Sequence, residues 1–161
     1  MTSLLHEIVQ KAVVDYGLVV EELECDIDYA DTTGFNEKYG FTPEQSANTI
    51  IVSSKKVDPV KYAVCVVLAS TRIDVNKKVT KLLKVKKASF AYSEVTRDLT
   101  GMEIGGVTAV GIEGYPIYVD AAVMEQPKII MGGGNRTSKL VIVPTELQKL
   151  PNVTVIEGLA H

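Results

Sequence analysis

The sequence predicts an α/β domain built on a mixed, strongly curved β-sheet flanked by helices, and three observations support this class. β-Branched apolar segments and helix-forming segments are interspersed along 161 residues, without the strict strand–helix repeat of a doubly wound sheet. The segment 62–69 (YAVCVVLA) is apolar on both faces, as a central strand is. With 46% hydrophobic residues, the chain 1–161 can bury one core, and we expect a single domain.

The first forty residues are expected to hold two helices around one strand. Apolar residues recur at helical spacing over 4–13, and Gly17 should end that helix. The segment 19–27 alternates apolar and acidic residues, which is typical of a strand. Asp31 can then cap a short helix that ends near Gly40.

The middle of the chain carries clear helix starts and a β-rich pair of segments. Thr42 is a cap followed by Pro at the first helical position and Gln three residues on, but 49–52 is β-branched and limits that helix to a few residues. Asp74 should cap a helix through Leu83, and Ser93 should cap another through Leu99. The remaining predicted elements are strands at 116–120, 128–131, 139–143 and 153–156 and a short helix opening at Pro144.

Composition excludes several functional classes. The net charge is −3, which argues against general nucleic-acid affinity, yet residues 1–44 carry −8 and residues 45–161 carry +5. Cys25 and Cys65 lie in strand-like stretches and are expected to be buried free thiols of a reducing compartment, hence a cytoplasmic protein. The only histidines are His6 and His161, so we expect no zinc site, no histidine-based triad and no cofactor. No signal peptide or membrane span is expected either.

Two glycine clusters lie within 101–143, beside predicted strand ends. They are Gly105-Gly106 with Gly111, and Gly132-Gly133-Gly134. Glycine allows positive φ and close approach to the main chain, so the clusters are either ordinary turns or the walls of one pocket that binds a ligand with backbone groups. We favour the pocket.

Lysines are concentrated at 77–87. On a helix, Lys77, Lys81 and Lys84 would share one face, which is either a solvated surface or a stripe that tracks phosphates. GGGNRTSK lacks the spacing of a P-loop, and neither glycine cluster fits a dinucleotide fingerprint. Asp120 closes a predicted strand as a catalytic carboxylate or a turn residue, and we favour the turn.

The order of four pieces resembles the YbaK/prolyl-tRNA-synthetase-associated editing domain family over about residues 35–157. The pieces are TPEQSANTIIV at 42–52, the strand 62–69 with the Asp74 helix, LTGMEIGGVTAVG at 99–111, and 128–134 with 140–147. The third is the most specific, being close to the family's T-G-x-x-x-G-G-[VI]-[ST]-P-x-G. The resemblance implies a barrel-like mixed sheet and hydrolysis of the ester between a wrong amino acid and the 3′ adenosine of a tRNA. It also implies that a substrate hydroxyl assists the attacking water.

Two positions depart from the family pattern. Asn48 stands where the family has a lysine that holds the terminal nucleotide, and Ala109 stands where the loop has proline. Asn48 carries no charge, and Ala109 loses the fixed φ of proline. Lys55, Lys56 or Arg136 could supply the missing cation from elsewhere.

The motifs and the resemblance together define two sets of candidate residues. The catalytic candidates are Asn48, Gly105, Gly106, Val107, Thr108 and Ala109. The substrate-binding candidates are Thr49, Gly111, Gly132, Gly133, Gly134, Asn135, Arg136, Lys77, Lys81 and Lys84. The leading hypothesis is a free-standing aminoacyl-tRNA deacylase that edits in trans, with tRNA as its partner and an aminoacyl-tRNA synthetase as a second candidate partner. The alternative is a weak or inactive module that binds tRNA ends, a nucleotide or a protein, and an unrelated small-molecule hydrolase is a third reading.

Overall fold

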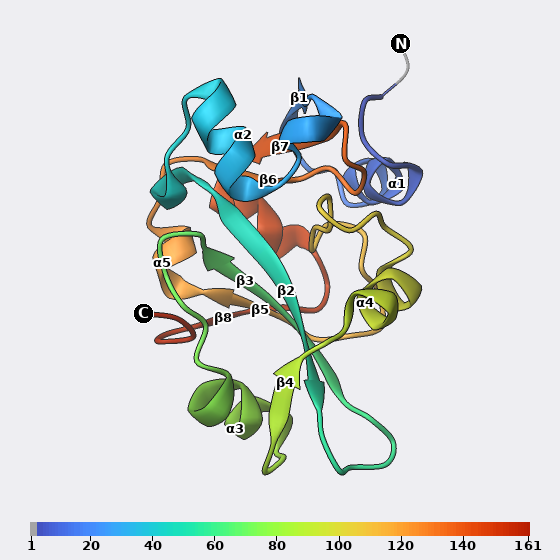
Figure 1. Cartoon of the computed structure of the whole chain (residues 1–161), viewed down its shortest axis with the longest axis vertical. Helices are drawn as coiled ribbons and strands as arrows, with labels where there is room; N and C mark the ends of the chain where they lie inside the picture. The colour runs from blue at the N-terminus through green and yellow to red at the C-terminus, as the bar shows by residue number, and fades with distance from the viewer. Residues whose placement is uncertain (1–2) are drawn as a thin grey trace.

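A computed structural model describes residues 3–161 and contains two sheets (Figure 1). The larger is mixed and has five strands in the order β4-β2-β3-β5-β8; the smaller is antiparallel, in the order β1-β7-β6. The strands are β1 Val20–Glu24, β2 Ala47–Ser54, β3 Tyr62–Leu68, β4 Ala88–Phe90, β5 Ile117–Asp120, β6 Ile129–Gly132, β7 Ser138–Ile142 and β8 Val153–Ile156. Ser46 and Ile130 form a parallel bridge that joins the sheets at the start of β2. The predicted α/β class with a mixed sheet is confirmed.

Strand β3 is central because both of its faces meet apolar layers. Val64, Val66 and Leu68 belong to the main core between the two sheets. Ala63, Cys65 and Val67 point the other way, into a second cluster beneath the helical segment 75–83. β3 pairs with β2 on one side and with β5 in parallel on the other. A strand buried on both faces has no polar alternation, which is the pattern that the sequence showed.

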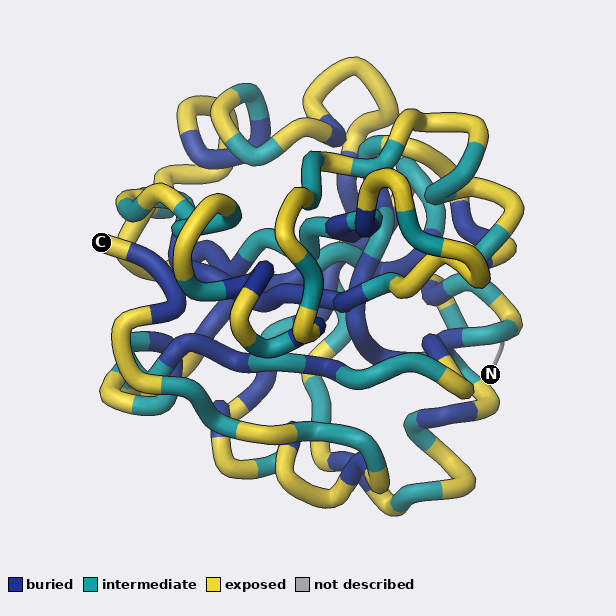
Figure 2. The backbone as a smooth tube through the Cα atoms, turned by 90° about the horizontal axis from the view of Figure 1, so that it is seen from below, coloured by how far each residue is buried: buried dark blue, intermediate teal, exposed yellow. Residues whose placement is uncertain are grey.

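Helix α2 begins and ends at the residues that the local signals indicated. The α-helices are α1 Glu7–Asp15, α2 Thr32–Tyr39, α3 Thr80–Leu83, α4 Ser93–Thr100 and α5 Ala121–Met124. Asp31 caps α2 by accepting a hydrogen bond from the Gly34 N–H at 2.7 Å, and Gly40 ends it with φ 78°. Helix α2 lies beside the smaller sheet, at the opposite end of the molecule from α3 (Figure 1). The tube view shows the buried segments running through the middle, with exposed turns around them (Figure 2).

Some local expectations were wrong. The helix after Asp74 starts with a π-helical turn, η3 Val75–Val79, and Lys84 lies past its end in a left-handed conformation with φ 58°. Lys77, Lys81 and Lys84 therefore do not form one regular helical stripe. Ser93 is the first residue of α4 rather than its cap, which is Tyr92.

The short 3₁₀ segments are η1 Ile27–Tyr29, η2 Pro43–Gln45 and η4 Pro144–Lys149. The predicted strand 19–27 ends at Glu24, since Asp26 caps η1 by accepting a hydrogen bond from the Asp28 N–H. Strand β4 and helix α5 were not predicted. Within residues 3–161 no helix is both long and apolar enough to cross a membrane.

Two predictions about single residues can be compared with the structure. Cys25 and Cys65 are buried and free, as expected. Asp120 is buried at the junction of β5 and α5, where its Oδ1 accepts a hydrogen bond from the Leu159 N–H at 3.2 Å. This places the carboxylate in a contact with the C-terminal segment.

Candidate functional site

The two glycine turns lie directly against each other. The Gly134 N–H donates to the Gly106 carbonyl at 2.7 Å. A Cβ on Gly106 would lie 2.1 Å from the Asn135 carbonyl oxygen, and one on Gly132 would lie 2.5 Å from the Gly106 carbonyl oxygen. The glycines at these positions are therefore required because main chain packs on main chain. This contact fixes the loop after α4 to the turn between β6 and β7.

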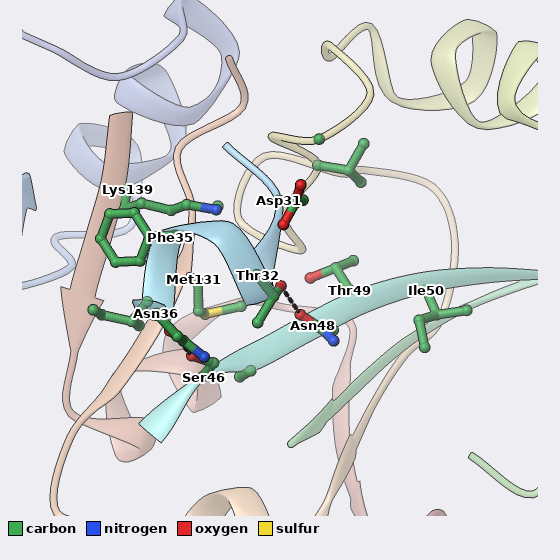
Figure 3. A pocket seen from close by; sticks show the side chains of 15 residues that line it. Asp31, Thr32, Phe35, Asn36, Ser46, Asn48, Thr49, Ile50, Met131 and Lys139 are labelled. Carbon is green, nitrogen blue, oxygen red and sulfur yellow. Dashed lines mark hydrogen bonds between the residues drawn. The ribbon is translucent and has the colours of Figure 1, made fainter. Parts of the chain in front are cut away.

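A cavity of about 290 Å³ opens beside this contact (Figure 3). Its walls come from α2, the start of β2, the end of β6, strand β7 and the loop 105–107. The lining residues are Asp31, Thr32, Phe35, Asn36, Ser46, Ala47, Asn48, Thr49, Ile50, Gly105, Val107, Ile130, Met131, Gly132 and Lys139. Segments that carried the family resemblance, at 42–52, 99–111 and 128–134, thus meet at one place.

The cavity has an inner and an outer part. The inner residues are buried: Phe35, Asn36, Ser46, Ala47, Ile130, Met131 and Lys139. The outer residues are half-buried: Thr32, Asn48, Thr49, Ile50, Gly105, Val107 and Gly132. Asp31 is exposed at the mouth. The space therefore passes from hydroxyl, amide and main-chain groups outside to an inner part where apolar Phe35, Ala47, Ile130 and Met131 stand beside polar Asn36, Ser46 and Lys139.

Neutral hydrogen bonds organise the mouth. The Thr32 hydroxyl donates to Asn48 Oδ1 at 2.6 Å, which ties α2 to β2 (Figure 3). The Ala109 N–H donates to Thr49 Oγ1 at 3.0 Å, which ties the glycine loop to the next residue of the same strand. A proline at 109 has no N–H and could not make this bond. Ala109 therefore allows a hydrogen bond between the glycine loop and β2 that a proline would remove.

Lys139 is a functional candidate that the sequence analysis missed. Its side chain is only 7% exposed, and its Nζ donates to the Ala30 carbonyl at 2.7 Å and lies 5.3 Å from the centre of the Phe35 ring. Burial lowers the pKa of this ammonium, whereas the nearby Cys25 and Asp31 oppose the shift. The signal was present in the sequence: Lys139 interrupts an apolar strand, and β alternation puts it on the same side as Val141.

Several candidate residues lie near the cavity without lining it. Gly106, Gly134 and Asn135 form the turn-to-turn contact, Gly133 packs on Ser138, and Thr108 and Ala109 are buried behind the loop. Gly111 packs on Ile8 of α1, away from this space. The lysines of 77–87 are on and around α3, at the other end of the molecule (Figure 1).

The expected replacement for the family lysine is also placed differently. The Arg136 guanidinium donates to the carbonyls of Ile104 and Ile27, both at 3.1 Å, so it braces the loop and does not line the cavity. Lys55 and Lys56 lie just beyond the far end of β2. Among the described residues that line the cavity, Lys139 is the only cation.

The described residues hold no cluster of three or more His, Cys, Asp or Glu side chains that could bind a metal ion. What the fold and cavity define is an α/β domain with a cavity that presents main-chain, amide and hydroxyl groups at its mouth and both apolar and polar side chains inside. The family model of the aminoacyl-tRNA editing domain matches residues 28–150. The chain belongs to this family, and the resemblance found in the sequence is confirmed.

Solved structures share the whole fold. A crystal structure of a candidate trans-editing enzyme for prolyl tRNA synthetase is 24% identical, with a TM-score of 0.81, and the match covers 98% of this chain and 98% of that chain. A crystal structure of a hypothetical protein is 22% identical, with a TM-score of 0.84 over 96% of this chain and 100% of that chain. At these identities the likeness establishes the fold.

Proposed function

We propose that this protein is a free-standing aminoacyl-tRNA deacylase that hydrolyses the ester of mischarged tRNA. The observation that carries the proposal is the cavity itself, because it is assembled from the segments whose motifs and family match point to editing. Its main-chain and amide mouth suits the ribose and ester of a terminal adenosine. Its inner chamber suits an amino-acid side chain.

The proposed reaction needs little from side chains. Water forms a bond to the ester carbonyl carbon, the bond from that carbon to the ribose oxygen breaks, and the ribose oxygen takes up a proton. An activated ester reacts without a strong base once water is oriented and the developing oxyanion is stabilised, and one missing donor can reduce the rate about 10²–10³-fold. A substrate hydroxyl beside the ester can assist the water, as the family resemblance implies.

The lysines around α3 are the second part of the proposal. Strand β2 pairs with β4, which follows the lysine-rich segment in the chain, at Val52–Ser54, whereas the cavity-lining residues of β2 are 47–50; β4 therefore lies about 15 Å along the strand from the cavity. An RNA helix that placed its 3′ end in the cavity could span that distance. Lys81 and its neighbours would then contact phosphates and raise the association rate.

The test is a panel of tRNAs charged with different amino acids, with ester loss followed over time. Gly106→Leu sets the background, because a leucine would force the two turns apart. Asn48→Ala, which removes the bond from Thr32, should slow cleavage while leaving the fold intact by circular dichroism. If no ester is lost faster than with Gly106→Leu, the deacylase proposal is wrong.

A binding module without catalysis is the second candidate, and the neutral Asn48 favours it. This protein would bind aminoacylated 3′ ends and leave the ester intact. Asn48→Lys separates the two candidates: turnover gained by this variant would show a competent scaffold that lacks one cation. Turnover by the unaltered chain would exclude the binding-only candidate.

A further inference from the structure

The buried ammonium of Lys139 has no carboxylate partner. Within residues 3–161 the two ion pairs are Lys11 with Asp15 and Lys149 with Glu146, both on the surface. Lys139 has the Ala30 carbonyl and the Phe35 ring as its contacts, which are neutral. Asp31 acts on Lys139 from a distance but forms no ion pair with it. Burying a charge without a paired carboxylate is costly, so a lysine kept there for stability alone is unexpected.

The surroundings of Lys139 define the shape of what it could bind. Phe35, Ile130 and Met131 enclose the inner chamber with it, and all three are buried. The phosphates of a tRNA belong to a polyanion whose bulk remains outside the cavity. A short side chain that carries one anionic group on a methylene stem could enter it.

The mouth has the opposite charge. Asp31 lies at the exposed rim, where its carboxylate caps α2, while Lys139 points along Phe35 inside (Figure 3). An aminoacyl ester carries a positive α-ammonium beside the ester and its side chain beyond. A cation inside and an anion outside match an ester whose side chain ends in a carboxylate.

We propose that Lys139 selects the aminoacyl group, and that the substrates are tRNAs charged with an acidic amino acid. This inference rests on the proposed function, since the aminoacyl group would occupy the same cavity. The aspartyl or glutamyl carboxylate accepts a hydrogen bond from the ammonium, which keeps its bond to the Ala30 carbonyl. The side-chain methylenes lie against Phe35 and Met131, and the ester stays at the mouth beside Asn48 and Thr49.

Binding of non-hydrolysable analogues tests the inference apart from catalysis. Adenosine that carries an amide-linked aspartyl, asparaginyl or leucyl group, and no phosphate, is titrated into the intact protein by calorimetry. The aspartyl analogue should bind at least about tenfold more tightly than either neutral analogue, since a charge-assisted hydrogen bond is formed out of water. Without a phosphate, any preference belongs to the aminoacyl group.

Two variants with the same change of side chain provide the comparison. Lys139→Met should abolish the preference for the aspartyl analogue. Lys38→Met should keep it: the Nζ of Lys38 also lies 5.3 Å from the centre of an aromatic ring, that of Tyr29, but Lys38 is an exposed residue of α2 and does not line the cavity. Lys139→Gln repeats the measurement if the Met variant fails to fold, and the preference within the unaltered protein needs no variant.

The outcomes separate the two proposals. Equal binding of the three analogues, or a preference that survives Lys139→Met, overturns the role of Lys139, even if alanyl-tRNA is cleaved and the deacylase stands. A preference lost in Lys139→Met with no ester cleaved supports the role of Lys139 and overturns the deacylase. Binding of none of the analogues overturns the role of Lys139, and the panel of charged tRNAs then decides the deacylase by itself.

Discussion

Replacing Gly106 by alanine tests the contact that holds the site together. The new Cβ would lie 2.1 Å from the Asn135 carbonyl oxygen, whereas ordinary contacts begin near 3.4 Å. Both groups belong to main chain, so the two turns must separate by about 1 Å. Overpacking of this kind costs about 1–3 kcal/mol, and weakening the Gly134 N–H bond to Gly106 adds about 1 kcal/mol. We expect the free energy of unfolding to fall by about 2–4 kcal/mol.

Urea unfolding followed by far-ultraviolet circular dichroism measures this change; the chain has no tryptophan to report it. Gly114→Ala is the matched control, because no atom lies within 4 Å of the new Cβ and only the positive φ of 83° opposes the substitution. That strain should cost about 1–2 kcal/mol. A Gly106→Ala protein within about 0.5 kcal/mol of the unaltered chain would refute the reasoning, as would an equal or larger loss in Gly114→Ala.

Four further results are expected. Ala109→Pro removes the N–H that donates to Thr49 Oγ1 and should lower the free energy of unfolding by about 1 kcal/mol. In a double-mutant cycle with Thr49→Val, fully additive losses of stability would show that this hydrogen bond contributes nothing. Burial raises the pKa of the Cys65 thiol to about 12, so iodoacetamide at pH 8 should modify Cys65 in the urea-unfolded chain and spare it in the folded one, as mass spectrometry would show. Burial lowers the pKa of Lys139 below 10.5, so between its folded and unfolded pKa values the unfolded chain binds more protons and the free energy of unfolding rises with pH. Lys139→Met should flatten this rise and increase the free energy of unfolding at pH 7. A decrease at pH 7 would show that the charge is stabilising. Lys81→Glu should weaken binding of whole tRNA and reduce its salt dependence while leaving the adenosine analogues unaffected; unchanged tRNA affinity would exclude contact with the lysines around α3.

Features with a local cause could be predicted from the sequence, and features made by long-range pairing could not. Asp31 and Gly40 bound α2 because a cap and a left-handed residue act within one turn of the helix. Strand β4 has three residues, and its existence depends on pairing with Val52–Ser54, some 35 positions earlier. The chain between them gives no local signal of that contact.

The sequence predicted which segments form the site, but it did not predict which side chains line the cavity. The glycine motifs indicated that residues 105–106 and 132–134 lie close together. The absence of side chains at Gly106 and Gly132 makes room for the main chain of the opposite turn and not for a ligand. Lys139 was overlooked because a lysine in a strand is normally exposed. Only the contacts with Ala30 and Phe35, which are distant in the sequence, show that the Lys139 side chain is buried.

The two departures from the family pattern belong to one rearrangement. Asn48 accepts a hydrogen bond from Thr32, which a lysine cannot do, and the neighbouring Thr49 accepts one from Ala109, which a proline cannot donate. Adjacent residues of β2 thus hold helix α2 and the glycine loop with neutral bonds. The cation of the cavity stands instead at Lys139, opposite Gly132 in the register of β6 and β7. In this chain the mouth is therefore held by neutral bonds, and the cation of the cavity lies in its buried part, where the proposed recognition of an amino-acid side chain requires it.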